Sequence, residues 1–275
     1  MRIRTGYNIT YECSEPTAIL AHLDLHPSRA RDLETPDRMI TTPGVELHRY
    51  EDMFGNICTR LLAPAGRITL KSEFILRDSG ATDPVAPGAI QHPVAYLPDE
   101  ALTFLLGSRY CETDRLSDIA WTFFGQTEPG WARVEAIVNF VHDHIRFDYQ
   151  QARPTRGAYE AYIEQIGVCR DYAHLAIAFC RCMNIPARYC TGYLGDIGVP
   201  LKPPMDFSAW FEAYLGGRWY VFDARNKIPR IGRALIARGR DATDVAITTS
   251  FGRLDLISFD VVATELPELQ PAEPA

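Results

Sequence analysis

Three residues in the second half of the chain have the types and spacing for nucleophilic chemistry. Cys169 follows a Gly-Val pair, Ser208 lies in the sequence Asp-Phe-Ser-Ala-Trp, and Asp223 ends the sequence Trp-Tyr-Val-Phe-Asp. A cysteine nucleophile normally gives its proton to a histidine, and an acidic residue orients that histidine. No histidine occurs between residues 175 and 275, so Ser208 occupies the place where a Cys, His, Asp order puts the base.

The position of Cys169 favours a reactive thiol. Gly167 and Val168 break the preceding helical pattern and place Cys169 in the first turn of a new helix. Unpaired N–H groups and the helix dipole lower a thiol pKa there, and they also supply donors for an oxyanion. The alternative is a structural cysteine at the start of a core helix. The seven cysteines lack metal-type spacing, so we predict neither a disulfide framework nor a metal site, and we expect most to be reduced core residues: Cys13, Cys58, Cys111, Cys169, Cys180, Cys182 and Cys190.

A glycine pair fixes the geometry around Ser208. Gly216-Gly217 between two strand patterns predicts a two-residue hairpin turn, which sets Trp210 opposite Asp223 and Ser208 opposite Arg225. Ser208 and Asp223 are then diagonal neighbours on one face. A histidine at position 208 would reach both Asp223 and a cysteine, whereas a serine cannot act as the base at neutral pH. The alternative is a core hairpin in which a buried Asp223 pairs with Arg225.

The histidines near the cysteine are weaker candidates for the base. His174 lies five residues after Cys169, about 140° around the helix, so the two side chains point to different faces. We expect His174 to be an interior or interface residue. His142 and His144 lack metal-ligand partners at helical spacing, and we expect them to be solvated or to cap a helix end.

Residues 1–90 predict a β-rich domain, an antiparallel sandwich or small barrel, because β-branched and aromatic runs alternate with short turn signals. The expected strands are Ile3–Cys13, Thr17–Leu25, Val45–Tyr50, Ile57–Leu62 and Gly66–Leu76. The segment Gly80–Pro98 is rich in proline and turn formers, and we expect it to be a surface linker that ends the domain.

Helical periodicity marks the start of a second domain, expected over residues 98–265. The expected helices are Asp99–Tyr110, Leu116–Phe124, Ala132–Ile145, Arg156–Ile166 and Cys169–Met183, of which the last is apolar on nearly all sides and therefore buried. Strands are expected at Ala187–Tyr193, Phe207–Leu215, Arg218–Ala224 and Leu254–Thr264. Residues 266–275 are rich in proline and glutamate and predict a flexible tail.

Composition narrows the class of protein. The chain is 47% hydrophobic and 23% charged, which is typical of a folded globular protein. A net charge of −7 without a long Lys/Arg run argues against nucleic acid as a partner. No apolar run approaches the roughly 18 residues of a membrane span and the N-terminus lacks a signal-peptide pattern, so we expect a cytoplasmic protein without a membrane partner.

These motifs resemble the transglutaminase-like superfamily, in particular bacterial transglutaminase-like cysteine proteases. The resemblance covers about residues 100–265 and rests on three blocks, 167–175, 184–193 and 207–223. It implies a papain-like α+β core with helices packed on an antiparallel sheet, preceded by a β-rich domain. It also implies Cys169 as nucleophile, Asp223 as the residue that orients the base, and no cofactor. Where the family motif usually has the catalytic histidine, this chain has Ser208.

Three functions follow as hypotheses. The first is hydrolysis or acyl transfer at amide or ester bonds of a peptide, protein or small molecule, through a thioester on Cys169. In that case Tyr172 and Tyr193 are poor substitute bases because phenol pKa values are too high, and a substrate amine could be its own base. The second is a catalytically degenerate binding or scaffold protein. The third is an acyl transferase for activated thioesters in small-molecule biosynthesis.

Overall fold

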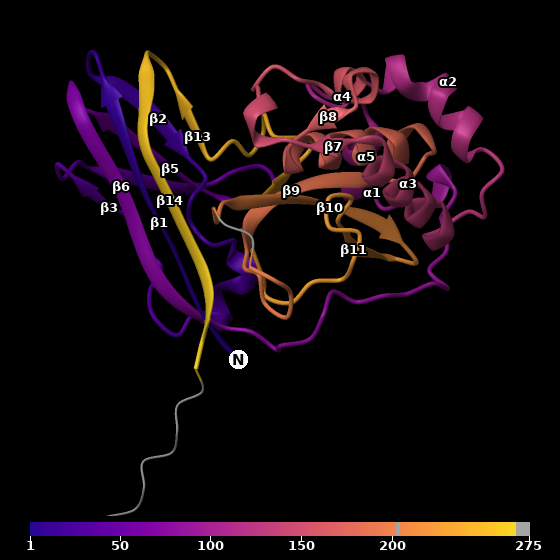
Figure 1. The fold of residues 1–275 in the computed structure, drawn as a ribbon, viewed down its shortest axis with the longest axis horizontal. Coiled ribbons are helices and arrows are strands. Elements are labelled where there is room, and N and C mark those ends of the chain that lie inside the picture. The colour runs from indigo at the N-terminus through magenta and orange to yellow at the C-terminus, as the bar shows by residue number, and fades with distance from the viewer. Residues whose placement is uncertain (202–203, 268–275) are drawn as a thin grey trace, which may run out of the picture.

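The structure is a computed structural model that describes residues 1–201 and 204–267. Two antiparallel sheets form a sandwich at one end, and a third sheet with helices on one face forms the other end (Figure 1). The predicted mixed α+β class is confirmed. The sandwich sheets have the strand orders β14-β1-β6-β3 and β13-β2-β5-β4. Their strands are β1 (Arg2–Cys13), β2 (Thr17–Ala21), β3 (Ile40–Thr42), β4 (Leu47–Glu51), β5 (Ile57–Ala63), β6 (Gly66–Arg77), β13 (Thr248–Ser250) and β14 (Leu254–Leu266).

Alternation of side chains builds the sandwich core. Along β6, Ile68, Leu70, Phe74 and Leu76 are buried while the residues between them are partly or fully exposed, apart from the buried Ser72. Successive side chains of a strand point to opposite faces, so this spacing directs one apolar row toward the facing sheet.

The two last strands belong to the sandwich. β14 pairs with β1 along its whole length, from Arg2 opposite Leu266 to Cys13 opposite Leu254, and β13 pairs with β2. The sequence placed the strand Leu254–Thr264 in the second domain, 98–265. The structure differs there because a strand pattern does not specify its partner, and β1 offers an open edge to the returning chain. Of the tail expected at 266–275, residues 268–275 lie outside the described part of the chain.

The second part of the molecule surrounds one buried helix. Its sheet has the order β11-β10-β9-β12, and helix α5 packs on β9 and β10 and against three other helices. From Asp171 to Cys182 every residue of α5 is buried, as predicted for a helix in the middle of a domain. The remaining bounds are α1 (Asp99–Leu102), α2 (Thr113–Phe124), α3 (Trp131–His144), α4 (Ala158–Glu164), α5 (Cys169–Cys182), β7 (Arg146–Phe147), β8 (Ile166–Gly167), β9 (Ala187–Leu194), β10 (Phe207–Leu215), β11 (Arg218–Phe222) and β12 (Arg233–Gly239).

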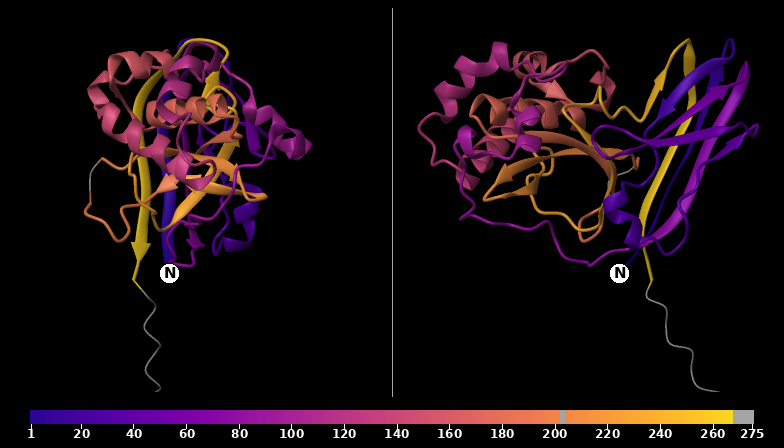
Figure 2. Two further views of the ribbon diagram at one scale, coloured as in Figure 1. Left: turned by 90° about the vertical axis from the view of Figure 1, so that its right-hand side faces the viewer. Right: turned by 180° about the vertical axis from the view of Figure 1, so that it is seen from behind.

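Two local features differ from the expectation. The helix expected over 99–110 stops after α1 and a short 3-10 turn, and the Leu106 carbonyl accepts a hydrogen bond of 3.0 Å from Arg181. Because this carbonyl accepts from Arg181, it does not accept the backbone hydrogen bond that would continue the helix. The strand β12 was not expected at all. Figure 2 shows the extended segment 80–98 running between the two parts. No helix in residues 1–201 and 204–267 is long and apolar enough to cross a bilayer.

Candidate active site

Cys169 is the first residue of α5, as predicted. Two residues fix the start of this helix. The Asp171 carboxylate accepts a hydrogen bond of 2.9 Å from the N–H of Val168, and it also accepts one of 3.1 Å from Arg156. The carboxylate thus satisfies an N–H at the helix terminus, and the buried Arg156 balances its charge.

The thiol of Cys169 is not acidified by this position. Burial raises its pKa to about 11, against the opposing effects of the Arg225 charge and the Ala209 N–H. Asp206 and Asp223 raise the pKa further. The expectation of a lowered thiol pKa is therefore wrong, because loss of water around the sulfur outweighs the nearby cation and the helix start.

The predicted hairpin register is confirmed. β10 pairs with β11 from Phe211 opposite Phe222 to Leu215 opposite Arg218. The turn glycines Gly216 and Gly217 have φ values of 55° and 83°, which glycine adopts without strain. The ladder ends at Phe222, so the two pairs expected beyond it do not form as strand pairs.

Asp223 lies just beyond the hairpin with its carboxylate fully engaged. Asn226 donates from its backbone at 2.9 Å and from its side chain at 2.8 Å, and Arg233 donates at 2.8 Å. Burial opposes ionisation of Asp223, but the Arg233 charge and the Asn226 hydrogen bonds outweigh it and lower the pKa. The alternative pairing of Asp223 with Arg225 is wrong, since the Arg225 guanidinium lies over the Phe147 ring at 4.1 Å.

Ser208 lies on β10 opposite Gly192 of β9. The residue is only 5% exposed, and its hydroxyl oxygen has no hydrogen-bond partner among the described residues. Leaving a buried hydroxyl unpaired costs about 1–3 kcal/mol. The Ala209 N–H and the Asp223 carboxylate both act on the Cys169 thiol, so Cys169, Ser208 and Asp223 lie in one region. No hydrogen bond joins Ser208 to Asp223 in residues 1–201 and 204–267.

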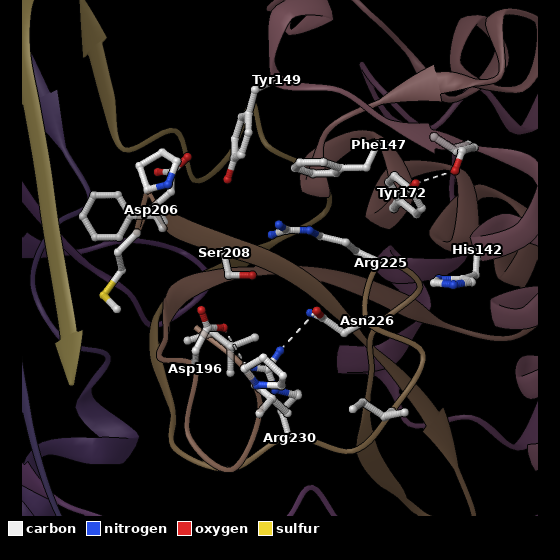
Figure 3. Close-up of a pocket in the computed structure, with 18 residues that line it drawn as sticks. His142, Phe147, Tyr149, Tyr172, Asp196, Asp206, Ser208, Arg225, Asn226 and Arg230 are labelled. Carbon is white, nitrogen blue, oxygen red and sulfur yellow. Dashed lines mark hydrogen bonds and ion pairs between the residues drawn. The ribbon is translucent and has the colours of Figure 1, made fainter. Parts of the chain in front are cut away.

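A cavity of about 700 Å³ opens beside this region (Figure 3). Arg225 points into it between Tyr149 and Ser208. The wall is formed by His142, Ile145, Phe147, Tyr149, Tyr172, Leu194, Asp196, Val199, Pro200, Pro204, Met205, Asp206, Phe207, Ser208, Arg225, Asn226, Ile228 and Arg230. Its charged side chains make the cavity suited to a polar ligand.

The sequence did not indicate a role for Asp206, and it did not indicate that Arg225 lines the cavity. Burial raises the pKa of Asp206, while the Phe207 N–H and the Arg225 charge act in the opposite direction. Asp206 precedes Ser208 by two residues, so strand alternation, applied one step further, would have placed both on one face. Arg225 forms no ion pair with the carboxylates of the described residues.

The histidines divide between the interior and the cavity wall. His174 is buried, accepts a hydrogen bond of 3.1 Å from the Ala242 N–H and stacks on Tyr110, so its prediction as an interior residue is confirmed. His144 hydrogen-bonds the Tyr162 carbonyl at 2.7 Å. His142 differs from the expected solvated or capping role, because it lines the cavity and its Nδ1 donates to the Ala224 carbonyl at 3.0 Å.

Comparison with known proteins places this arrangement in a family. Residues 119–224 match the transglutaminase-like superfamily. A solved structure from Cytophaga hutchinsonii, described as a "putative cysteine protease", is similar over the whole fold, with a TM-score of 0.81 and 30% identity, covering 98% of this chain and 92% of that chain. An uncharacterised Mycobacterium leprae protein is 27% identical over 270 residues, 88% of each chain. The chain belongs to the transglutaminase-like superfamily, and the predicted resemblance is confirmed.

Proposed function

We propose that the protein is a cysteine enzyme that hydrolyses or transfers an acyl group from an amide or ester bond, through a thioester on Cys169. The observation that carries the proposal is the position of this thiol at the start of a buried helix, near Arg225, which lines a cavity of about 700 Å³. Cys169 is partly exposed as a residue, unlike the other six cysteines, which are all buried. The cation of Arg225 acts on the sulfur from the cavity wall.

The proposed reaction begins when the Cys169 sulfur attacks the substrate carbonyl carbon. A bond forms between sulfur and carbon, the carbonyl oxygen takes the negative charge, and collapse of this intermediate expels the amine, alcohol or thiol. Backbone N–H groups at the helix start and the Arg225 guanidinium are the donors available for the developing charge. Water or an amine then releases the acyl group from sulfur.

The absence of a histidine at position 208 restricts the choice of substrate. An amide needs a proton on its departing amine, whereas a thioester or activated ester expels a stable anion without one. Burial raises the Tyr172 pKa to about 12 and also raises that of Tyr193 well above its ordinary value, so neither phenol replaces the base. Asp206 is the proposed proton acceptor, since burial raises its pKa and its charge acts on the Cys169 thiol. We therefore rank activated esters and thioesters above peptides.

Intact mass spectrometry tests the proposal. The protein is incubated separately with an aryl thioester, an aryl ester and a peptide amide, and the mass added to Cys169 is mapped by proteolysis. We expect an acyl adduct from the thioester, a slower one from the ester, and none in the Cys169→Ala variant. Absence of an adduct from every donor at about pH 9, where more of the thiol is ionised, would contradict an acyl-transfer function.

Two observations favour a binding protein as the second candidate. The Asp223 carboxylate is held by Arg233 and Asn226, and the Ser208 hydroxyl has no partner in the described residues. Under this hypothesis the cavity binds a polar ligand without turnover. The Ser208→His variant separates the candidates, because new hydrolase activity would indicate a site complete except for its base. A cytoplasmic location stays a prediction from the sequence.

A further inference from the structure

A second group of thiol, imidazole and carboxylate lies in the sandwich. Strand β5 lies between β2 and β4, and Tyr50 of β4 is directly opposite Cys58 of β5. On the other side Ala21 is opposite Thr59, so the antiparallel register brings His22, the residue after β2, next to Cys58. Three neighbouring segments therefore place His22, Cys58 and Tyr50 in a row on one face.

Cys58 is buried although it lies on the outer face of its sheet. The other residues of β5 on that face, Arg60 and Leu62, are exposed, whereas Cys58 is 1% exposed. The chain at Ala246 and Ile247 crosses beside this end of the strand, and the His22 N–H donates to the Ile247 carbonyl at 3.1 Å. The thiol is therefore buried among polar groups of the neighbouring segments.

His22 has the bonding of a base held in place. Its Nδ1 lies 3.1 Å from the Ala246 carbonyl, so this nitrogen carries a proton, and its Nε2 lies 3.5 Å from an Asp52 oxygen. His22 and Tyr50, its two cross-strand neighbours, both act on the Cys58 thiol and lower its pKa. The ring can therefore accept the thiol proton while Asp52 stabilises the resulting imidazolium, the arrangement that Cys169 lacks.

The neighbouring side chains, taken together, lower the pKa of Cys58 and raise that of His22. Burial raises the pKa of Cys58, but the hydrogen bonds from His22 and Tyr50 outweigh it and lower the pKa, with Asp52 opposing. Burial lowers the pKa of His22, but Cys58, the Ala246 carbonyl and Asp52 outweigh it and raise the pKa. Arg60, on the same strand as Cys58, acts on Tyr50.

We propose that Cys58 is a second reactive thiol, deprotonated by His22, and that small hydroperoxides modify it to a sulfenic acid. The Cys58 thiolate attacks one peroxide oxygen, a sulfur–oxygen bond forms and the oxygen–oxygen bond breaks. The departing hydroxide takes the proton from His22 and leaves as water. Sulfur is oxidised by two electrons and the peroxide is reduced by two.

The enclosure of Cys58 selects small reagents. Strand β4 is the edge of its sheet, and four of its five residues are exposed. Tyr50, whose side chain neighbours the thiol, is 38% exposed. Opening of an edge strand is among the least costly local motions of a sheet. It admits hydrogen peroxide more readily than a bulky acyl donor. Among residues 1–201 and 204–267 no set of three His, Cys, Asp or Glu side chains is arranged to hold a metal.

Peroxide labelling of the full-length protein tests the proposal. The protein is treated with hydrogen peroxide at about pH 7, unfolded in the presence of dimedone, and the labelled cysteines are mapped by mass spectrometry. We expect Cys58 to be labelled at least about tenfold faster than Cys13 and Cys190, because burial raises the pKa of both. Equal rates at the three thiols would overturn the proposal, and this comparison needs no variant.

A matched pair of variants tests the part played by His22. We expect His22→Gln to slow labelling of Cys58 about tenfold or more. His144→Gln is the control, because His144 hydrogen-bonds the Tyr162 carbonyl and stacks on Phe140 and Tyr162, not on a thiol. An unchanged Cys58 rate in folded His22→Gln protein would overturn the proposal. Neither result depends on turnover at Cys169.

Discussion

The pH dependence of Cys169 alkylation follows directly from the environment of the thiol. With the pKa raised to about 11 by burial, about one molecule in 10⁴ carries the thiolate at pH 7 and about one in 100 at pH 9. An ordinary cysteine, with a pKa of about 8.5, is roughly 3% ionised at pH 7. We therefore expect iodoacetamide to alkylate Cys169 about 300-fold more slowly than a free thiol at pH 7, with a tenfold rise per pH unit up to about pH 10.

A histidine at position 208 should change the shape of this profile. In the Ser208→His variant we expect an imidazolium to stabilise the Cys169 thiolate, and each tenfold gain in rate at pH 7 corresponds to about 1.4 kcal/mol. Ser208→Asn is the control, since it adds a polar side chain of similar length without a base. Peptide mapping at each pH gives the rate at Cys169 alone. A wild-type rate that levels off below pH 9, or equal rates in the two variants, would refute the reasoning.

Three further predictions concern single residues. Arg225→Met should shift the Cys169 alkylation profile to higher pH and lower the rate at pH 9 several-fold, with Arg225→Lys restoring it, because the Arg225 charge lowers this thiol pKa. Burial lowers the pKa of His174 to about 3, so the unfolded chain binds a proton that the folded chain excludes, and stability falls as the pH drops below about 6.5. At pH 5.5 this loss is about 1.4 kcal/mol. Urea unfolding at pH 7.5 and at pH 5.5 measures the change in unfolding free energy, and in the His174→Gln variant that change should be smaller by this amount. Asp223→Asn should destabilise the fold by about 3 kcal/mol in the same assay because it leaves Arg233 short of a buried partner, whereas Asp143→Asn, at a side chain 70% exposed, should cost less than about 0.5 kcal/mol.

Local patterns in the sequence were enough to place the principal residues on their elements. The Gly-Val break located the start of α5 at Cys169, and Gly216-Gly217 fixed the β10–β11 register, because both depend on residues a few positions apart. The partner of Asp223 was beyond this reasoning. Arg233 reaches it from β12, a strand that was not expected and that pairs with β9 across the sheet.

The acidity of Cys169 was mispredicted for a related reason. The helix start at Cys169 is visible in the sequence, and a helix start lowers a thiol pKa. Desolvation depends on how completely β10 and the segments around the cavity cover the sulfur, which is a property of the assembled fold. Asp206 shows the same limit: its proximity to Ser208 follows from alternation, but the burial that raises its pKa does not.

The two thiol sites have complementary chemistry, and this affects how labelling is interpreted. Cys169 is partly exposed and lies near the Arg225 cation of the cavity wall, but its pKa is raised to about 11, whereas Cys58 has a base and a lowered pKa but almost no exposure. A small electrophile at neutral pH should therefore react first at Cys58, while a bulky one should be limited to the partly exposed Cys169 and react slowly. Loss of activity plotted against total thiol content would not show which of the two cysteines had reacted. Comparing iodoacetamide with a bulky maleimide, residue by residue, separates acidity from access: if the maleimide also reacts first at Cys58, enclosure by Tyr50 does not control access.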